Sequence, residues 1–234
     1  MKKNVLFFSP TYYELPLNEN IKKKYDNLSE VANVTVLAFS SQKKIHTESK
    51  TTFYLNKKNK SRIFNYLKIF FVSYFQMFKL ISQHEIEIVT FQDPVTSFLG
   101  VYKIKKKHKD VKIVIESHGD FINTLELEKN LTFPNLYKNL FSRMASYTIN
   151  CADMLRAVSS STEKQALSFD PSKRVVRFPA WIDFEIFSNI EPQRDNKGKF
   201  KILFIGSVTD RKKPHMIIDA LPELINDEVE LNIV

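Results

Sequence analysis

Short apolar runs alternate with amphipathic segments along most of this 234-residue chain. The runs are rich in β-branched and aromatic residues, which is typical of strands buried on both faces. They occupy residues 4–9, 33–39, 51–55, 85–91, 111–116, 154–158 and 175–178. Between them, apolar positions at helical spacing mark residues 17–31, 96–109, 134–151 and 163–169. This alternation predicts an α/β fold built on a doubly wound parallel sheet.

Two of these boundaries depend on individual residues. We expect the first strand to end at Pro10, since proline has no N–H to donate to a neighbouring strand. We expect Ser161 or Thr162 to cap the helix over residues 163–169, because a hydroxyl oxygen can accept a hydrogen bond from a first-turn N–H group.

The segment over residues 61–83 predicts a long helix that is apolar nearly all round. Such a helix either packs between the sheet and neighbouring helices or lies in a membrane interface; its polar interruptions disfavour a membrane span. Lysines cluster before it, at residues 57–62, and again at residues 103–109. Lysine runs are usually solvated faces, but these two together could bind an anionic membrane.

The last part of the chain predicts a second, incomplete domain. Residues 191–199 combine a glycine and a proline with many charges, as interdomain linkers do. After them come a strand at 200–205, a helix at 214–225 and a strand at 229–234. Because a β-α-β piece cannot bury a core of its own, we expect an N-terminal domain over 1–190, a linker over 191–199 and a truncated second domain over 200–234.

Composition limits the classes of function. The 43% content of hydrophobic residues excludes a disordered chain, and the net charge of +9 favours anionic partners. Cys151 is the sole cysteine, which excludes an internal disulfide, and the five histidines show no metal-ligand spacing. The lysine clusters lack interleaved aromatics, which disfavours nucleic acid. The N-terminal apolar run is too short for a signal peptide, so we expect a cytoplasmic protein.

Candidate chemistry follows the strand at 111–116, where the chain reads Ser117, His118, Gly119, Asp120. Ligands of parallel α/β sheets bind at the carboxyl ends of strands. His118 is either a site residue or hydrogen-bonds to the backbone at the strand end. Asp120 either contacts substrate hydroxyls or caps a helix. Asp93 follows the strand at 85–91, where it either faces the same site or forms a turn with Pro94.

The order of these features resembles the family 4 glycosyltransferases of the GT-B fold, which have two Rossmann-like domains. The motifs that carry the resemblance are Gln92-Asp93-Pro94 with Gly100, Ser117-His118-Gly119-Asp120, Cys151-Ala152-Asp153 with Val158-Ser159-Ser160, Pro179 to Phe187, and Gly206 to Leu221. Each motif is weak alone, and their shared order and spacing are more specific. The match covers most of this chain and the first half of a typical member.

The resemblance implies transfer of a sugar, with retention of configuration, from a nucleotide sugar to a cell-surface glycan or lipid-linked acceptor, without a metal cofactor. It implies catalytic roles for His118 and Asp120 and substrate binding by Asp93 and Gly119. The residues implied in donor binding are Gly206, Ser207, Arg211 and Lys212. A cation there would stabilise the diphosphate leaving group; a solvated loop is the other interpretation. A lipid-linked acceptor would suit peripheral contact with the inner membrane face.

Three departures from the family pattern suggest a different role. Ser207 stands where the family has an arginine, and residues 9–13 contain no glycine where many members carry a Gly-Gly loop. The family's E-x7-E segment would fall after Val234, so we expect the 234-residue chain alone to be an inactive transferase. The alternative is a degenerate, non-catalytic subunit that binds a catalytic partner.

Overall fold

The computed structural model describes residues 2–48, 50–61, 64–65, 68–69, 73–122, 134–188, 191, 200–209, 212–224 and 229–234. The chain divides into two compact units. The first comprises Met1–Ile122 and Phe133–Asp183, and the second comprises Asn123–Thr132 and Phe184–Val234.

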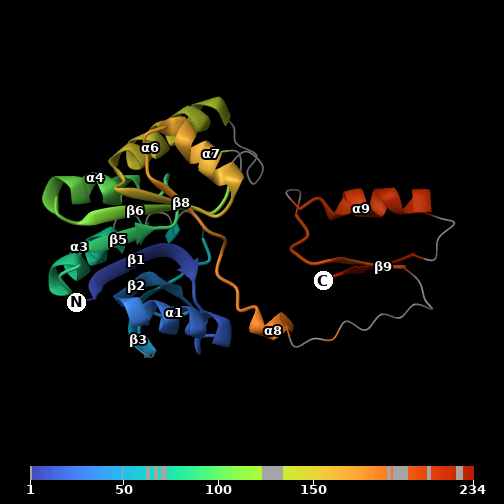
Figure 1. Cartoon of the computed structure of the whole chain (residues 1–234), viewed down its shortest axis with the longest axis horizontal. Coiled ribbons are helices and arrows are strands. Elements are labelled where there is room, and N and C mark those ends of the chain that lie inside the picture. The colour runs from blue at the N-terminus through green and yellow to red at the C-terminus, as the bar shows by residue number, and fades with distance from the viewer. Residues whose placement is uncertain are drawn as a thin grey trace. The chain divides into compact units, whose positions relative to one another are not determined.

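An eight-stranded sheet runs through the first unit (Figure 1). Its strands are β1 Lys3–Tyr12, β2 Ala32–Ser40, β3 Lys44–Glu48, β4 Thr51–Lys57, β5 Ile88–Phe91, β6 Lys112–Ser117, β7 Met154–Ala157 and β8 Val175–Arg177. The order is β3-β4-β2-β1-β5-β6-β7-β8, and every pairing is parallel except β3 with β4. The predicted fold class is confirmed. The chain builds outward from β1 to β4 and then returns to the other side of β1, so the topological switch point lies between β1 and β5.

Helices cover both faces of this sheet. They are α1 Glu19–Val31, α3 Tyr74–Gln83, α4 Phe98–Lys107, α6 Pro134–Cys151 and α7 Ser160–Phe169. In β2, Val34, Val36 and Ala38 pack in one hydrophobic cluster with Tyr25 of α1. The alternate residues Leu37 and Phe39 belong to the larger cluster, which includes residues of α3, α4, α6 and α7. Since successive side chains of a strand point to opposite faces, β2 is mostly apolar because both of its faces are buried.

Gly100 of α4 packs against side chains of α3 and β5. A Cβ at this position would lie 2.5 Å from Cε1 of Tyr74 and 3.0 Å from Cε1 of Phe91. Both rings are fully buried. A side chain therefore has no room at position 100, which gives a packing reason for this glycine.

The two boundaries that depend on individual residues are wrong, one strand has no counterpart in the prediction, and each difference has a local cause. Strand β1 continues past Pro10 to Tyr12, because its pairing with β2 shifts register between Phe8 and Tyr12 and needs no proline N–H there. The cap of α7 is Ser159, whose side chain accepts a hydrogen bond from the Thr162 backbone N–H group. Strand β3 was not predicted, because its sequence is mostly polar and pairs at the sheet edge.

The predicted helix over residues 61–83 is described in full only from Ser73 onward, and residues 62–63, 66–67 and 70–72 lie outside the described part. Its C-terminal half is α3. The side chains of Tyr74, Met77, Leu80 and Ile81 are buried, whereas that of Phe75 is 76% exposed. This half of the helix packs on the core by one face. Within the described residues, we find no helix both long and apolar enough to cross a bilayer.

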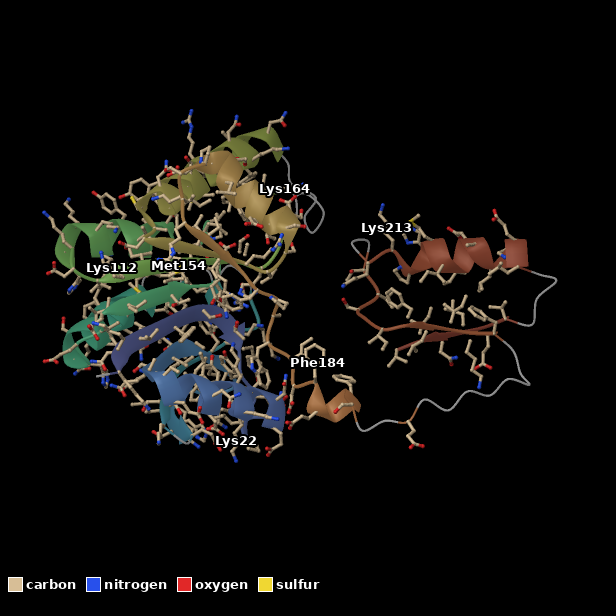
Figure 2. The ribbon with its side chains drawn as sticks, in the orientation of Figure 1. Lys22, Lys112, Met154, Lys164, Phe184 and Lys213 are labelled. Atoms are coloured by element: carbon tan, nitrogen blue, oxygen red, sulfur yellow. The ribbon has the colours of Figure 1, made fainter. Side chains whose placement is uncertain are left out.

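The second unit contains the expected β-α-β arrangement. Strands β9 Phe200–Phe204 and β10 Val229–Ile233 are parallel. Helix α9 Pro214–Ala220 joins them and continues as a 3-10 helix over Leu221–Leu224. Lys213, at the start of α9 (Figure 2), has a left-handed backbone conformation, and Pro214 follows at the first helical position. The short helix α8, Glu185–Ser188, also belongs to this unit.

Candidate functional site

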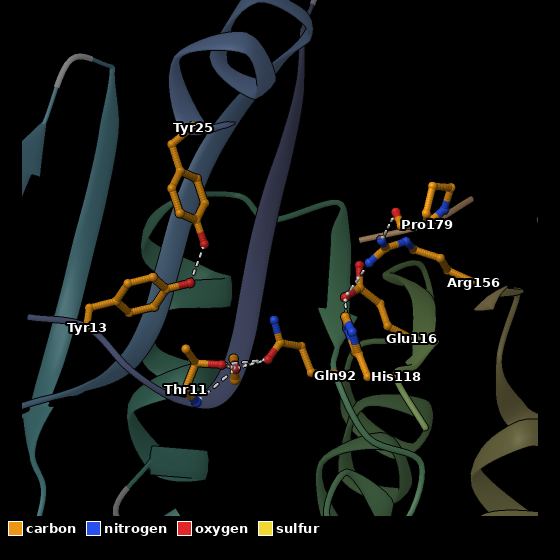
Figure 3. A network of polar contacts seen from close by, with 9 residues as sticks. Thr11, Tyr13, Tyr25, Gln92, Glu116, His118, Arg156 and Pro179 are labelled. Carbon is orange, nitrogen blue, oxygen red and sulfur yellow. Dashed lines mark hydrogen bonds and ion pairs between the residues drawn. The ribbon is translucent and has the colours of Figure 1, made fainter. Parts of the chain in front are cut away.

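The switch point of the first sheet carries a cluster of polar side chains. The Thr11 hydroxyl donates a hydrogen bond of 2.8 Å to Oε1 of Gln92, and the Ser9 hydroxyl donates to the same oxygen (Figure 3). Ser9 and Thr11 lie near the end of β1, and Gln92 follows β5 directly. These bonds hold the Gln92 amide at the carboxyl edge of the sheet. Its Nε2 donors have no partner within the described residues.

Glu116 and His118 lie at the carboxyl end of β6, next in the sheet to β5. Nε2 of His118 is 2.8 Å from Oε2 of Glu116, and the guanidinium of Arg156 lies 3.1 Å from the same carboxylate oxygen (Figure 3). Glu116 and Arg156 are direct partners in the β6–β7 pairing. The Glu116 side chain is 9% exposed and that of Arg156 is 12% exposed, whereas His118 is 40% exposed. The buried ion pair therefore supports an imidazole that reaches the surface.

Burial alone would raise the pKa of Glu116, but its neighbours outweigh burial and hold the pKa below its ordinary value. The opposing contributions are the hydrogen bond from His118, the positive charges of Arg156 and Lys24, and the attraction of the His118 ring when it is protonated. Burial lowers the pKa of Lys24. The negative charge of Glu116 acts to raise this pKa, and the positive charge of Arg156 acts to lower it further. Glu116 is therefore an ionised carboxylate within a net-positive group of side chains.

Arg156 also ties this cluster to the segment that follows β8. One guanidinium nitrogen donates a 3.0 Å hydrogen bond to the Pro179 carbonyl, and the guanidinium carbon lies 4.1 Å from the centre of the Phe178 ring. At the other end of the segment, Nζ of Lys23 lies 3.0 Å from both carboxylate oxygens of Asp183. The Pro179-to-Phe187 motif thus begins in a segment fixed to β7 and α1.

Two buried tyrosines lie beside the cluster. The hydroxyls of Tyr13 and Tyr25 are 2.6 Å apart, one from the end of the β1 segment and one from α1 (Figure 3). Burial raises the pKa of both phenols, and the negative charge of Glu116 adds to the effect. Both remain neutral hydrogen-bonding groups at physiological pH. The glycine-free segment at residues 9–13 thus ends in a packed aromatic residue.

Asp93 forms a turn. Its Oδ1 accepts hydrogen bonds from the backbone N–H groups of Val95 at 2.9 Å and Thr96 at 2.6 Å. Burial raises the pKa of this carboxyl, while those hydrogen bonds act to lower it. Of the two interpretations of Asp93, the turn-forming one describes its contacts.

Gly119 and Asp120 lie on the exposed loop after β6. Oδ1 of Asp120 accepts a bond from the Ile122 backbone at 3.1 Å and one from the Gln165 amide at 2.6 Å. Asp120 thereby connects this loop to α7. A Cβ at Gly119 would meet no atom within 4 Å, so this glycine marks an open position.

The residues implied in donor binding belong to the second unit. Gly206 follows β9 with a φ of 151°, a conformation that favours glycine, and its N–H bonds to the Val234 carbonyl. Ser207 and Lys212 are exposed. The backbone of Lys212 is hydrogen-bonded to the Thr209 carbonyl in the turn before α9. Arg211 lies outside the described residues.

The sequence motifs do not point to the two charged residues that organise the site of the first unit. Glu116 belongs to the predicted strand before His118, and a carboxylate in a run buried on both faces is a signal that it has a partner. That partner, Arg156, lies 40 residues further along the chain, and only the pairing of β6 with β7 brings them together. Within the described ranges, no group of three or more histidine, cysteine or acidic side chains could hold a metal ion.

The fold is that of the GT-B glycosyltransferases. Similar solved structures include sucrose-phosphate synthase from Thermosynechococcus elongatus (9% identity, TM-score 0.68), a lipopolysaccharide outer core galactosyltransferase, WaaB (17%, 0.55), and an α,α-trehalose-phosphate synthase (UDP-forming) from Burkholderia xenovorans in complex with glucose-6-phosphate (11%, 0.63). These matches cover 99%, 98% and 98% of this chain but only 62%, 60% and 65% of those chains.

A family model described as Glycosyltransferase Family 4 matches residues 30–186, which is more than half of the chain. The chain therefore belongs to glycosyltransferase family 4. No curated protein matches the sequence significantly.

Proposed function

We propose that the protein is a retaining glycosyltransferase that transfers a hexose from a nucleotide sugar to a glycan or lipid-linked acceptor. Residues 1–190 form the acceptor side, 191–199 the linker and 200–234 the start of the donor-binding domain. Family membership supports sugar transfer. The observation that carries the proposal is the partly exposed His118, supported by a buried ion pair at the carboxyl edge of the sheet.

The chemistry requires a cation for the leaving group and polar groups for the sugar. A nucleoside diphosphate leaves with developing negative charge, which Arg211 and Lys212 would stabilise, with Gly206 and Ser207 giving close backbone access. His118 and Asp120 would contact the transferred sugar or the acceptor hydroxyl, with Gly119 and Asp93 shaping their surroundings. No step in this scheme requires a metal ion.

The test uses the full-length protein with a panel of nucleotide sugars and simple glycan acceptors. Proton NMR of the product reports the anomeric configuration, which should match that of the donor. An inverted product would overturn the retaining assignment. Absence of both transfer and donor hydrolysis across the panel would count against the enzyme.

A non-catalytic subunit is the second candidate function. The observation that favours it is the exposed Ser207, which stands where the family carries a phosphate-binding arginine. A full-length protein that binds no nucleotide sugar in calorimetry, yet co-purifies with an active transferase, would support this candidate. Donor binding by the full-length protein would contradict it.

We propose an anionic membrane surface as the partner of the surface formed by the β3–β4 sheet edge and helix α3. A groove of about 650 Å³ lies there, lined in part by the exposed side chains of Ile45 and Phe75 and by Lys43, Lys44 and Lys79. Exposed apolar groups flanked by lysines match the arrangement that binds anionic lipid headgroups. A lipid-linked acceptor would be reached from this surface.

Liposome flotation tests the membrane partner. The protein should float with vesicles containing anionic lipid at low salt, and less so as salt rises. Replacing Lys43, Lys44 and Lys79 by glutamine should abolish flotation. The comparison variant replaces Lys103, Lys106 and Lys107 of α4, which belong to the lysine run at 103–109 and do not line the groove. If the groove is the contact, this variant should float normally. If both triple variants lose flotation equally, net charge and not the groove would explain the binding, and the proposed surface would be wrong.

A further inference from the structure

The two ring nitrogens of His118 have different surroundings. Nε2 lies 2.8 Å from a carboxylate oxygen of Glu116. Nδ1 has no hydrogen-bond partner within the described part of the chain, and the side chain is 40% exposed. Which nitrogen carries the proton decides whether His118 offers a donor or an acceptor to a ligand.

Glu116 settles the direction of this hydrogen bond. Its carboxylate is buried and faces three basic side chains: Arg156 from β7, His118 from its own strand end, and Lys24 from α1. These neighbours keep the pKa of Glu116 below its ordinary value, so the group is ionised at neutral pH. An ionised carboxylate only accepts hydrogen bonds. The proton shared with Nε2 must therefore belong to the histidine.

We propose that Glu116, held by Arg156, is a positioning residue that fixes the Nε2–H tautomer and the ring orientation of His118, which leaves Nδ1 as an acceptor for a sugar hydroxyl. This inference rests on the proposed function for its substrate. The ligand group that meets Nδ1 is then a hydrogen-bond donor, as a hydroxyl is, and a phosphate oxygen would find no partner there.

The surroundings of Glu116 are built to hold it in one place. Arg156 is its direct partner across the β6–β7 pairing, and the guanidinium is itself fixed by the Pro179 carbonyl and the Phe178 ring. A buried ion pair costs desolvation and is a weak source of stability compared with apolar packing. Orientation of the adjacent imidazole gives this pair a role that apolar side chains could not supply.

Nitrogen-15 NMR of the 234-residue chain tests the tautomer directly. At a pH of about 9, imidazole rings are ordinarily neutral, and the two-bond correlations distinguish the two tautomers. We expect the Nε2–H pattern for His118 in the wild type and a mixed pattern in Glu116→Gln. A wild-type Nδ1–H pattern would overturn the proposal, and so would an unchanged pattern in the variant.

The chain contains its own matched control for this experiment. Nε2 of His46 lies 2.9 Å from Oε2 of Glu48, a pair of the same kind on β3 and away from the site. Glu48→Gln should change the His46 pattern and leave that of His118 intact, while Glu116→Gln should do the opposite. If Glu116→Gln fails to fold, the wild-type tautomer still decides the question.

Kinetics of the full-length enzyme test the catalytic consequence. Loss of the fixed orientation should lower kcat by about 10²-fold, as small misplacements of reacting groups do, with little change in the donor KM. Arg156→Lys keeps the charge beside Glu116 and should lose less. Glu163→Gln, which removes only the surface pair with Arg177, should retain full activity. Unchanged kcat in Glu116→Gln would refute positioning; an inactive wild type would instead refute the proposed function, leaving the NMR result to judge the tautomer.

Discussion

Replacing Gly100 by alanine should destabilise the first unit, although alanine is the better helix former. The new Cβ would lie 2.5 Å from Cε1 of Tyr74 and 3.0 to 3.1 Å from two atoms of Phe91. Ordinary carbon contacts lie at about 3.5–4.0 Å, so the Tyr74 ring or α4 must move by about 1 Å. Tyr74 cannot move freely, because it stacks on Phe8 with ring centres 5.2 Å apart and donates to the Thr96 carbonyl.

The magnitude follows from two opposing terms. Overpacking a core costs about 1–3 kcal/mol, and the upper part of that range applies because both rings are fully buried. Alanine in place of glycine stabilises the helix by about 1 kcal/mol, because alanine has the higher helix propensity. The expected net loss in the free energy of unfolding is therefore about 1–2 kcal/mol.

Urea unfolding followed by circular dichroism and by the fluorescence of Trp181, the single tryptophan, measures this loss. The matched control is Gly119→Ala, whose Cβ would meet no atom within 4 Å, and its unfolding free energy should stay within about 0.5 kcal/mol of the wild type. A Gly100→Ala protein as stable as the wild type would refute the packing argument.

Three further predictions test other parts of the fold. Ser159→Ala should lower the free energy of unfolding by about 1 kcal/mol through loss of the α7 cap, whereas Ser161→Ala should not; urea titration compares them. Tyr25→Phe should cost about 1–3 kcal/mol, because the buried Tyr13 hydroxyl loses its partner, as calorimetry would show. Because the pKa of Glu116 is lowered in the folded state, its carboxylate stabilises the fold at pH values above the ordinary glutamate pKa. This stabilisation is lost as the pH falls through the lowered pKa. Urea unfolding at pH 3 to 7 should thus show that the difference in unfolding free energy between the wild type and Glu116→Gln becomes smaller in acid.

The sequence was sufficient for the parallel sheet, because strands buried on both faces leave continuous apolar runs. The run at residues 33–39 became β2, whose side chains enter two separate clusters. The helix predicted over residues 134–151 is confirmed as α6, Pro134–Cys151. Strand β3 gave no such signal, because an edge strand with one exposed face needs few apolar residues.

Local ambiguity explains the errors at element ends. Four consecutive hydroxyl residues, 159–162, could each cap α7, and only the extended backbone of Ser159 identifies the cap. Pro10 is tolerated within β1 because the pairing with β2 is irregular there, a property of two strands and not of one.

The candidate site was predictable only in part. The rule for carboxyl ends of parallel strands predicts its position and points to His118. The ion pair that holds His118 could not be predicted, because Glu116 and Arg156 meet only through the order of the strands, which no local sequence pattern encodes. The sequence leaves Asp93 either facing the site or forming a turn, and its hydrogen bonds to Val95 and Thr96 are those of a turn.

Sugar transfer by the full-length protein with alanine in place of His118 tests whether this imidazole takes part in catalysis. The substitution leaves the Glu116–Arg156 pair in place, so the fold should persist. We expect kcat to fall by at least about 10²-fold, while the affinity for nucleoside diphosphate measured by calorimetry is unchanged. Transfer at the wild-type rate by the His118→Ala protein would contradict this expectation.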